Sequence, residues 1–175
     1  MQLRVSKLLR KDATGLPWLG TFHSISAKLL RKHADAVGLK SNFSIIDQDD
    51  QVRLIKNICK AENVDIKKIS PKFILAIIDK WKNKGFYPQD VILKRKDPLE
   101  KNFLSIYKIY QEKLVNLNSA DFSDLILHTL KIFEKYTDIA ELYSKKFKYI
   151  LVDEYQDTNF IQSEWLRYLS GHNKN

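Results

Sequence analysis

The chain has 175 residues, and 44% of them are hydrophobic, which is enough apolar material for one or two small cores. Only five Gly and four Pro are present, so a low-complexity chain is excluded. Thirty Lys and Arg against 21 Asp and Glu give a net charge of +9. A balance this basic favours a polyanionic partner such as nucleic acid, although a well-solvated lysine-rich surface has the same composition.

A single cysteine, Cys59, excludes an internal disulfide and fits a reducing cytoplasm. It falls on an apolar helical stripe, so we expect a core residue rather than a nucleophile. The four histidines show no metal-ligand spacing. No apolar stretch reaches the length of a membrane span, and no signal peptide is recognisable. The sequence therefore predicts a cytoplasmic protein without a membrane partner.

The first third of the chain has weak local signals. Residues 1–11 have helical spacing, and residues 12–17 form a turn-rich connector. The run Trp-Leu-Gly-Thr-Phe over 18–22 predicts a short strand. A helix follows over 23–37, and Gly38 suits its C-terminus.

Helix start signals are clearer in the middle of the chain. Asp47 predicts the N-cap of a helix that runs to about Glu62. The pair Ser70-Pro71 predicts a second helix that ends near Gly85. Asp97-Pro98-Leu99-Glu100 has the pattern of a capping box and opens the longest helix of the chain.

The last third combines helices with a second short strand. Further helices are predicted over 121–135, 138–146 and 160–169. The last of them is capped by Asn159, with Gln162 three residues on. The apolar run 148–152 predicts a strand, and helices separate it from the strand over 18–22. Two such strands would be parallel members of one sheet, so the sequence predicts a mostly α chain that carries a piece of a parallel α/β domain.

Three carboxylates follow the apolar run directly, at Asp153, Glu154 and Asp157. In open parallel sheets, ligands bind at the carboxyl ends of the strands. Two adjacent acids can divide the work of phosphoryl transfer, with Asp153 holding Mg²⁺ and Glu154 orienting or deprotonating the attacking water. The alternative interpretation is an acidic loop in which Asp157 caps the next helix.

Residues 20–24 place a glycine, two hydroxyls and an imidazole at a strand-to-helix junction. Thr21, His23 and Ser24 can present donors to a phosphate at a helix N-terminus, and Phe22 can support a base. By itself the pattern is weak, because Ser24 could serve only as a cap and Phe22 only as a packing residue.

Together, in this order and about 130 residues apart, the two motifs resemble those of UvrD/Rep-type superfamily 1 DNA helicases. Gly20–Ser24 is similar to the GTFHS motif of that family, and Leu151–Asn159 is similar to its LVDExQDTN sequence, the Walker B motif. Residues 120–125 are similar to the DFxDL sequence that precedes the Walker B motif. The resemblance runs the whole length of the chain.

The resemblance implies ATP and Mg²⁺ as cofactors of the full-length protein. Asp153 would be the Mg²⁺-associated carboxylate and Glu154 the base that activates water on the γ-phosphate. Gln156 and Asp157 would belong to the network that links the nucleotide to the DNA-facing part of the motor. Residues 21–24 would lie beside single-stranded DNA, with the two hydroxyls near phosphate.

No phosphate-binding GxxxxGK[ST] sequence occurs in the 175 residues, so the resemblance implies an internal fragment. Residues 1–24 would be a segment of motor domain 1A, residues 25–117 the helical domain 1B, and residues 118–175 the return segment of domain 1A. The fragment would bind DNA weakly, hydrolyse no ATP, hold no cofactor, and dimerise through exposed strand edges. The full-length protein would be a 3′→5′ helicase acting on the nucleoid with repair or replication proteins.

The stretch 67–101, inside the expected domain 1B, is rich in Lys and Arg. Lys80 and Lys84 share a helix face, and Lys94-Arg95-Lys96 follows soon after. These side chains could contact the phosphates of duplex DNA, or they could form a solvated face.

Two other functions fit parts of the sequence. A stand-alone basic helical module could bind nucleic acid without catalysis. A metal-dependent nuclease could use Asp153, Glu154 and Asp157, but no further cluster of acids or histidines completes such a site.

Overall fold

The structure, a computed structural model, describes residues 6–7, 18–64, 69–93 and 98–171. Helices make up most of this part of the chain, which confirms the mostly α fold. The helix expected over 1–11, except for residues 6–7, and the connector expected over 12–17 lie outside the described residues.

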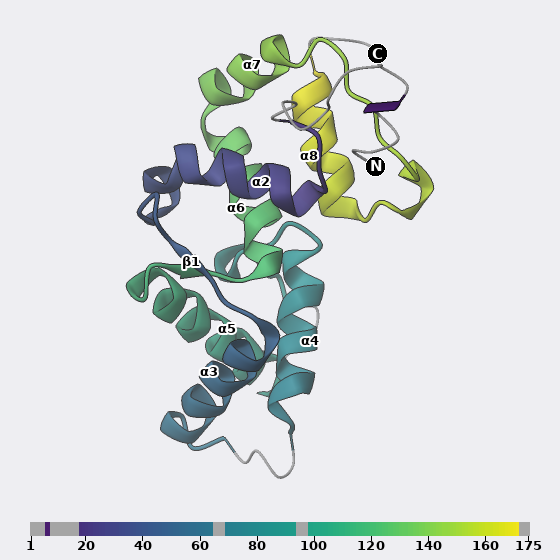
Figure 1. Cartoon of the computed structure of the whole chain (residues 1–175). Coiled ribbons are helices and arrows are strands. Elements are labelled where there is room, and N and C mark those ends of the chain that lie inside the picture. Colours follow the sequence, from purple (N-terminus) through teal and green to yellow (C-terminus); the bar gives the residue numbers. More distant parts are fainter. Residues whose placement is uncertain (1–5, 8–17, 65–68, 94–97, 172–175) are drawn as a thin grey trace.

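Two helical lobes lie one above the other in Figure 1. The upper lobe contains α2 (Phe22–Lys32), α6 (Phe122–Lys135), α7 (Thr137–Lys146) and α8 (Phe160–Ser170). The lower lobe contains α3 (Gln48–Ala61), α4 (Pro71–Lys82) and α5 (Pro98–Asn116). Helix α6 begins at the junction, where it contacts α4, and continues upward between α2 and α8. The division into domains stays a prediction, and its first boundary falls inside α2.

Three helices, α3, α4 and α8, start at the caps predicted from the sequence, whereas the cap predicted at Asp97 lies outside the described residues. The Asp47 side chain accepts a hydrogen bond from the amide of Asp50, and Ser70 does the same for the amide of Phe73. At α8, Asn159 and Gln162 form a complete capping box. The helix starts in the middle and at the end of the chain are therefore set by local sequence.

The helix predicted over 23–37 is interrupted at His33. Helix α2 ends at Lys32, and a 3₁₀ turn, η2, spans Ala34–Val37. At His33 the backbone leaves the helical region, and its Nε2 atom lies 3.1 Å from the hydroxyl of Tyr143 in α7. Gly38 ends the 3₁₀ turn with a positive φ of 78°, as its predicted terminal role requires.

The two expected strands at 18–22 and 148–152 are not formed, so their positions were predicted wrongly. Helix α2 already begins at Phe22, and 148–152 is irregular, with Leu151 97% exposed. A strand requires a ladder partner, and among the described residues neither segment has one.

A small parallel sheet forms elsewhere, at the junction of the lobes. Strand β1 (Ser44–Ile45) pairs with β2 (Ser119–Ala120). Backbone bonds of 3.0 Å extend the pairing on both sides, from the amide of Ser44 to Asn118 O and from the amide of Ile46 to Ala120 O. The sheet therefore joins the segment that enters the lower lobe to the segment that leaves it.

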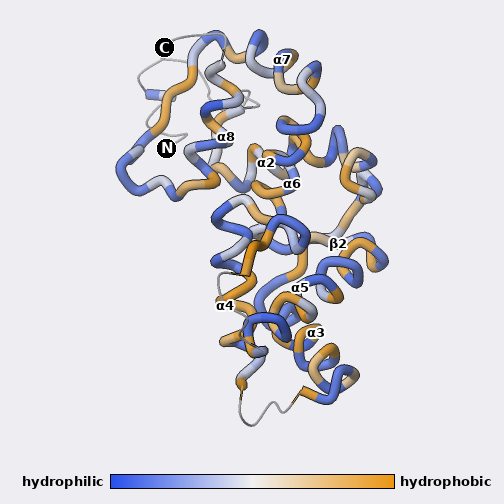
Figure 2. Tube along the Cα trace, turned by 180° about the vertical axis from the view of Figure 1, so that it is seen from behind, coloured by the Kyte–Doolittle hydropathy of each residue, from blue (hydrophilic) through white to orange (hydrophobic). Residues whose placement is uncertain are grey.

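Each lobe has its own core. In the lower lobe Ile58, Ile74 and Tyr110 are fully buried, and Cys59 lies with them, which confirms it as a core residue. In the upper lobe Phe133 and Trp165 belong to a second cluster. Figure 2 shows hydrophobic and hydrophilic residues alternating along the helices of both lobes, as expected of amphipathic helices.

Candidate active site

A cavity of about 880 Å³ brings the two sequence motifs together in the upper lobe. The first motif contributes Gly20–His23, and the second contributes Asp153 and Glu154. Trp165 of α8 also lines the cavity, and α8 lies beside the start of α2 in Figure 1. Segments about 130 residues apart in the sequence therefore share one site.

Asp153 and Glu154 are exposed carboxylates at the start of the acidic loop, residues 153–159. Among the described residues, neither carboxylate takes part in a hydrogen bond or an ion pair. Glu154 has a positive φ of 51°, whereas the other described non-glycine residues with positive φ are the asparagines Asn63 and Asn118. Such backbone strain in a residue other than Gly or Asn is concentrated at functional sites.

Gln156 and Asp157 lie in a 3₁₀ turn, η4 (Tyr155–Asp157), directly after Glu154. Both are exposed, and neither lines the cavity. The Thr158 hydroxyl donates to Tyr155 O at 2.8 Å and fixes the end of the turn. The structure thus places these two predicted nucleotide-network residues outside the cavity, on the loop that leads to α8.

Residues 20–24 shape the N-terminus of α2. Thr21 is the N-cap, and its hydroxyl accepts from the amide of Ser24 at 3.2 Å. The Ser24 hydroxyl donates to Thr21 O at 2.9 Å. A Cβ atom at Gly20 would collide with the Ser24 hydroxyl, so only glycine fits there without a shift. Thr21 and Ser24 are exposed. Among the described contacts the Thr21 hydroxyl keeps its proton for a phosphate, whereas the Ser24 hydroxyl would have to give up its bond to Thr21 O.

The two rings of this motif point to different neighbours. Phe22 packs edge-on against Trp165 with 5.7 Å between ring centroids, so it contributes to the core. His23 contacts the ring of Phe122, the first residue of α6, at 6.0 Å. Burial lowers the pKa of His23, so the imidazole is neutral at pH 7. The position of Phe122 was missed from sequence, although the DFxDL pattern was a signal for it.

The basic stretch is not one continuous surface. Lys80 and Lys84 are exposed near the end of α4, as expected, whereas Lys94-Arg95-Lys96 lies outside the described residues. Lys82, between the two exposed lysines, is fully buried against Asp121 and Asp124 of the DFxDL pattern. Sequence reasoning missed this cluster.

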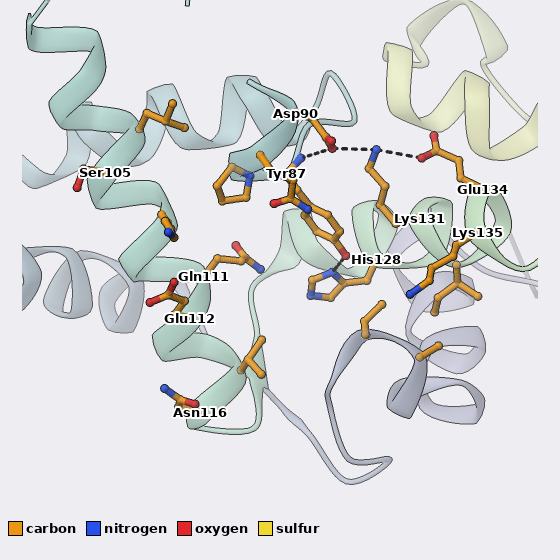
Figure 3. Close-up of a pocket in the computed structure, with 18 of the residues that line it drawn as sticks. Tyr87, Asp90, Ser105, Gln111, Glu112, Asn116, His128, Lys131, Glu134 and Lys135 are labelled. Carbon is orange, nitrogen blue, oxygen red and sulfur yellow. Dashed lines mark hydrogen bonds and ion pairs between the residues drawn. The ribbon is translucent and has the colours of Figure 1, made fainter. Parts of the chain in front are cut away.

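A larger cleft of about 1160 Å³ lies between the lobes (Figure 3). On its wall the hydroxyl of Tyr87 lies 2.5 Å from Nδ1 of buried His128. Lys131 bridges Asp90 at 3.0 Å and Glu134 at 2.9 Å. These charges are paired with one another, in contrast to the carboxylates of the acidic loop.

The acidic loop fits a magnesium ion by its chemistry, because unpaired carboxylate oxygens are the ligands that Mg²⁺ prefers. Within the described residues, no three His, Cys, Asp or Glu side chains gather into a metal site. The nuclease alternative requires such a cluster, and Asp153, Glu154 and Asp157 do not supply it. No helix in the described part of the chain is both long enough and apolar enough to cross a membrane.

The two sequence motifs thus meet on one cavity, beside a helical lobe. The family model of the UvrD/REP helicase N-terminal domain matches residues 1–175, and the chain belongs to this family. It is 38% identical to the ATP-dependent DNA helicase PcrA of Staphylococcus epidermidis and 39% identical to that of Staphylococcus aureus, over its whole length. It is 41% identical, over 90% of its length, to the "Probable DNA helicase II homolog" of Rickettsia conorii.

The chain spans 24% of the length of these curated relatives. The family membership is therefore shown for this 175-residue segment, which contains both motifs.

Proposed function

We propose that the full-length protein carrying this chain is an ATP-dependent DNA helicase that moves 3′→5′ along single-stranded DNA in the cytoplasm. The observation that carries the proposal is the single cavity shared by residues 20–23 and the pair Asp153 and Glu154. Family membership supports the same function, since the relatives at 38–41% identity are named as DNA helicases.

In this function the acidic loop supplies the catalytic groups. Asp153 would hold Mg²⁺, directly or through a water molecule, and Glu154 would orient or deprotonate the attacking water. When bound, the ion neutralises charge on the phosphates of ATP. Both carboxylates are exposed and have no partner among the described residues, which supports these roles, because neither has to break a described bond to bind. Gln156 and Asp157, on the adjoining turn, would link the bound nucleotide to the DNA-facing part of the motor.

The N-terminus of α2 supplies the DNA contact. Thr21 and Ser24 are exposed at a helix start without acidic residues in its first turn, so a backbone phosphate would be attracted there. Lys80 and Lys84, together with Lys94, Arg95 and Lys96, would contact duplex DNA through salt-sensitive phosphate contacts. Repair or replication proteins are the expected partners of such an enzyme.

The 175-residue chain alone is proposed to hydrolyse no ATP, since positioning the triphosphate is most of the catalysis and no phosphate loop occurs in this sequence. It would hold no cofactor and bind DNA weakly. The exposed segment with Tyr149 and Leu151 could pair with a second copy. DNA-stimulated ATP hydrolysis by the purified chain would contradict this part of the proposal.

The experiment that tests the function uses Glu154→Gln in the full-length protein. We expect DNA-stimulated ATP hydrolysis to fall by about 100-fold or more, since general-base catalysis contributes that much. DNA binding, measured by fluorescence anisotropy, should remain. The matched control is Glu141→Gln, which changes an exposed glutamate of α7 that pairs with the surface lysine Lys145, away from the cavity.

Retained ATP hydrolysis in Glu154→Gln would remove the catalytic assignment. It would favour the alternative, a basic helical module that binds nucleic acid without catalysis. That alternative rests on the net charge of +9 and predicts equal DNA affinity with and without ATP.

A further inference from the structure

Lys82 is the last residue of α4, and it is fully buried where the two lobes meet. Its Nζ atom lies 2.6 Å from Asp121 Oδ2 and 2.7 Å from Asp124 Oδ1. Asp121 is the N-cap of α6, and Asp124 completes the capping box with it. A cation from the lower lobe therefore binds both residues that begin the central helix of the upper lobe.

Other polar contacts complete this cluster from α5. The hydroxyl of Tyr110 donates to Asp121 Oδ2 at 2.9 Å, and the Gln111 side chain donates to Asp124 Oδ1 at 2.9 Å. Gln111 also lines the interlobe cleft in Figure 3. Helices α4, α5 and α6 thus meet through directional, charge-assisted hydrogen bonds rather than through apolar contact alone.

In this cluster one buried cation faces two buried carboxylates. Burial by itself would lower the pKa of Lys82, but the charges of Asp121 and Asp124 outweigh it and hold that pKa above its ordinary value. Burial and the neighbouring Asp124 raise the pKa of Asp121 to about 6, whereas Lys82 keeps the pKa of Asp124 low. The lysine is therefore charged at neutral pH, and the ion pair persists.

The residue after Lys82 contacts the last residue of the acidic loop. Asn83 is exposed, and its Oδ1 accepts a hydrogen bond of 3.1 Å from the side chain of Asn159. Asn159 ends the acidic loop and caps α8. One helical turn of the lower lobe therefore binds the helix that follows Asp153 and Glu154.

The same turn also reaches the other motif of the cavity. Asp79 accepts from the hydroxyl of Ser123 at 3.0 Å, beside Phe122. Phe122 in turn contacts His23 at the start of α2. The end of α4 is consequently linked to His23 through Ser123 and Phe122, and to the acidic loop through Asn159, although it lines no part of the cavity itself.

We propose that the last turn of α4, Asp79–Asn83, is a positioning element that couples the lower lobe to the ATP site. Lys82 fixes the direction of α6 and with it the Phe122–His23 contact, while Asn83 fixes the end of the acidic loop that carries Glu154. A change in the lower lobe on binding DNA is transmitted through this turn to the catalytic loop. The inference rests on the proposed helicase function and deepens it.

The sharpest test uses Asn83→Ala in the full-length protein, because Asn83 is exposed and its loss leaves both cores intact. The measured quantity is the ratio of ATP hydrolysis with saturating single-stranded DNA to hydrolysis without DNA. We expect the ratio to fall about fivefold or more, in the range of ordinary coupling between sites, with DNA-free hydrolysis unchanged. Asn83→Asp keeps the acceptor oxygen toward Asn159 and should retain the ratio. Asn57→Ala, an exposed asparagine of α3, is the control.

Lys82→Met tests the buried half of the element in the same assay, with circular dichroism reporting whether it folds. If it folds, its ratio should fall as well, and the DNA concentration for half-maximal stimulation should rise. The proposal is overturned if the parent protein is DNA-stimulated and Asn83→Ala keeps the parental ratio. Failure of the helicase function looks different, because the parent protein itself would then show no DNA-stimulated hydrolysis.

Discussion

Two pairs of acidic residues in this molecule have opposite surroundings. Asp121 and Asp124 are buried at the junction of the lobes, where each contacts Lys82 and a donor from α5. Asp153 and Glu154 are exposed, and among the described residues their carboxylates contact no donor. The first pair is satisfied by the fold, whereas the second remains available to a ligand.

The comparison separates architecture from chemistry. A buried carboxylate needs a paired cation or donor, and removing that partner lowers the free energy of unfolding. An exposed carboxylate without partners adds little to stability, so its place in a cavity beside a strained backbone requires another explanation. Mutations at the buried pair should therefore change stability, and mutations at the exposed pair should change ATP hydrolysis.

The largest effect is expected for Lys82→Met in the 175-residue chain. Removing the ammonium leaves two buried carboxylates without a cation, and we expect a loss of about 3–5 kcal/mol in the free energy of unfolding. Urea denaturation followed by circular dichroism measures it. The control Lys145→Met removes an exposed lysine of α7 and should change stability by less than about 0.5 kcal/mol. Equal effects of the two substitutions would show that the junction cluster does not bear on stability.

The second expectation is that the Lys82→Met defect depends on pH. Asp121 already has its pKa raised to about 6, and loss of the lysine raises it further. An acid with a raised pKa in the folded state stabilises the fold when protonated, and that stability is lost as the pH rises through the folded pKa. The difference in unfolding free energy between the parent chain and Lys82→Met should therefore become smaller as the pH is lowered from 8 to 5.

His128 gives an independent pH effect. Burial lowers its pKa, so both proteins lose stability as the pH falls below about 6.5, where the unfolded chain takes up the proton. Because this loss is common to the parent chain and Lys82→Met, it largely cancels in the difference between their unfolding free energies. A gap that widens on acidification would contradict the charge assignment of the junction.

A smaller effect is expected for Thr21→Ala at the start of α2. The substitution removes the hydroxyl that accepts from the amide of Ser24, and a lost N-cap costs about 1 kcal/mol. Thr21→Ser keeps the cap and should be near the parent protein in thermal unfolding. A cap effect would show that a residue facing the cavity can serve both the fold and the site.

The smallest effect on stability is expected for Asp153→Asn. Its carboxylate is exposed and unpaired among the described residues, so the change in unfolding free energy should be below about 0.5 kcal/mol. In the full-length protein the same substitution should abolish Mg²⁺-dependent ATP hydrolysis. Marked destabilisation by Asp153→Asn would erase the contrast between the two acidic pairs.

The sequence predicts the helices well wherever their ends are set locally. Asp47, Ser70 and Asn159 act as caps as expected, because a cap bonds a backbone amide within three residues. The strand predicted over 148–152 depends on partners far away in sequence. Its apolar composition indicated a strand, but no described strand lies beside it, so the segment stays irregular.

The site was predicted in part. The pairing of residues 20–24 with Asp153 and Glu154 followed from family resemblance, and the structure brings these segments to one cavity. Lys82 could not be distinguished from its exposed neighbours Lys80 and Lys84, because its partner Asp121 lies 39 residues later. Local pattern shows a charge, whereas burial depends on which distant residues fold against it.

The pairing of β1 with β2 has a practical consequence. The chain enters the lower lobe at Ser44 and leaves it at Ser119, and these two residues are partners in the same ladder. The lower lobe is thus an insertion whose two connections to the upper lobe lie side by side in the small sheet. Because the two strands are parallel, their ends are adjacent but point the same way, so a linker that replaced 46–118 would have to cross back over the sheet and would need about a dozen residues or more. Lys82 and Asn83 are then the attachments that such an exchange would have to rebuild.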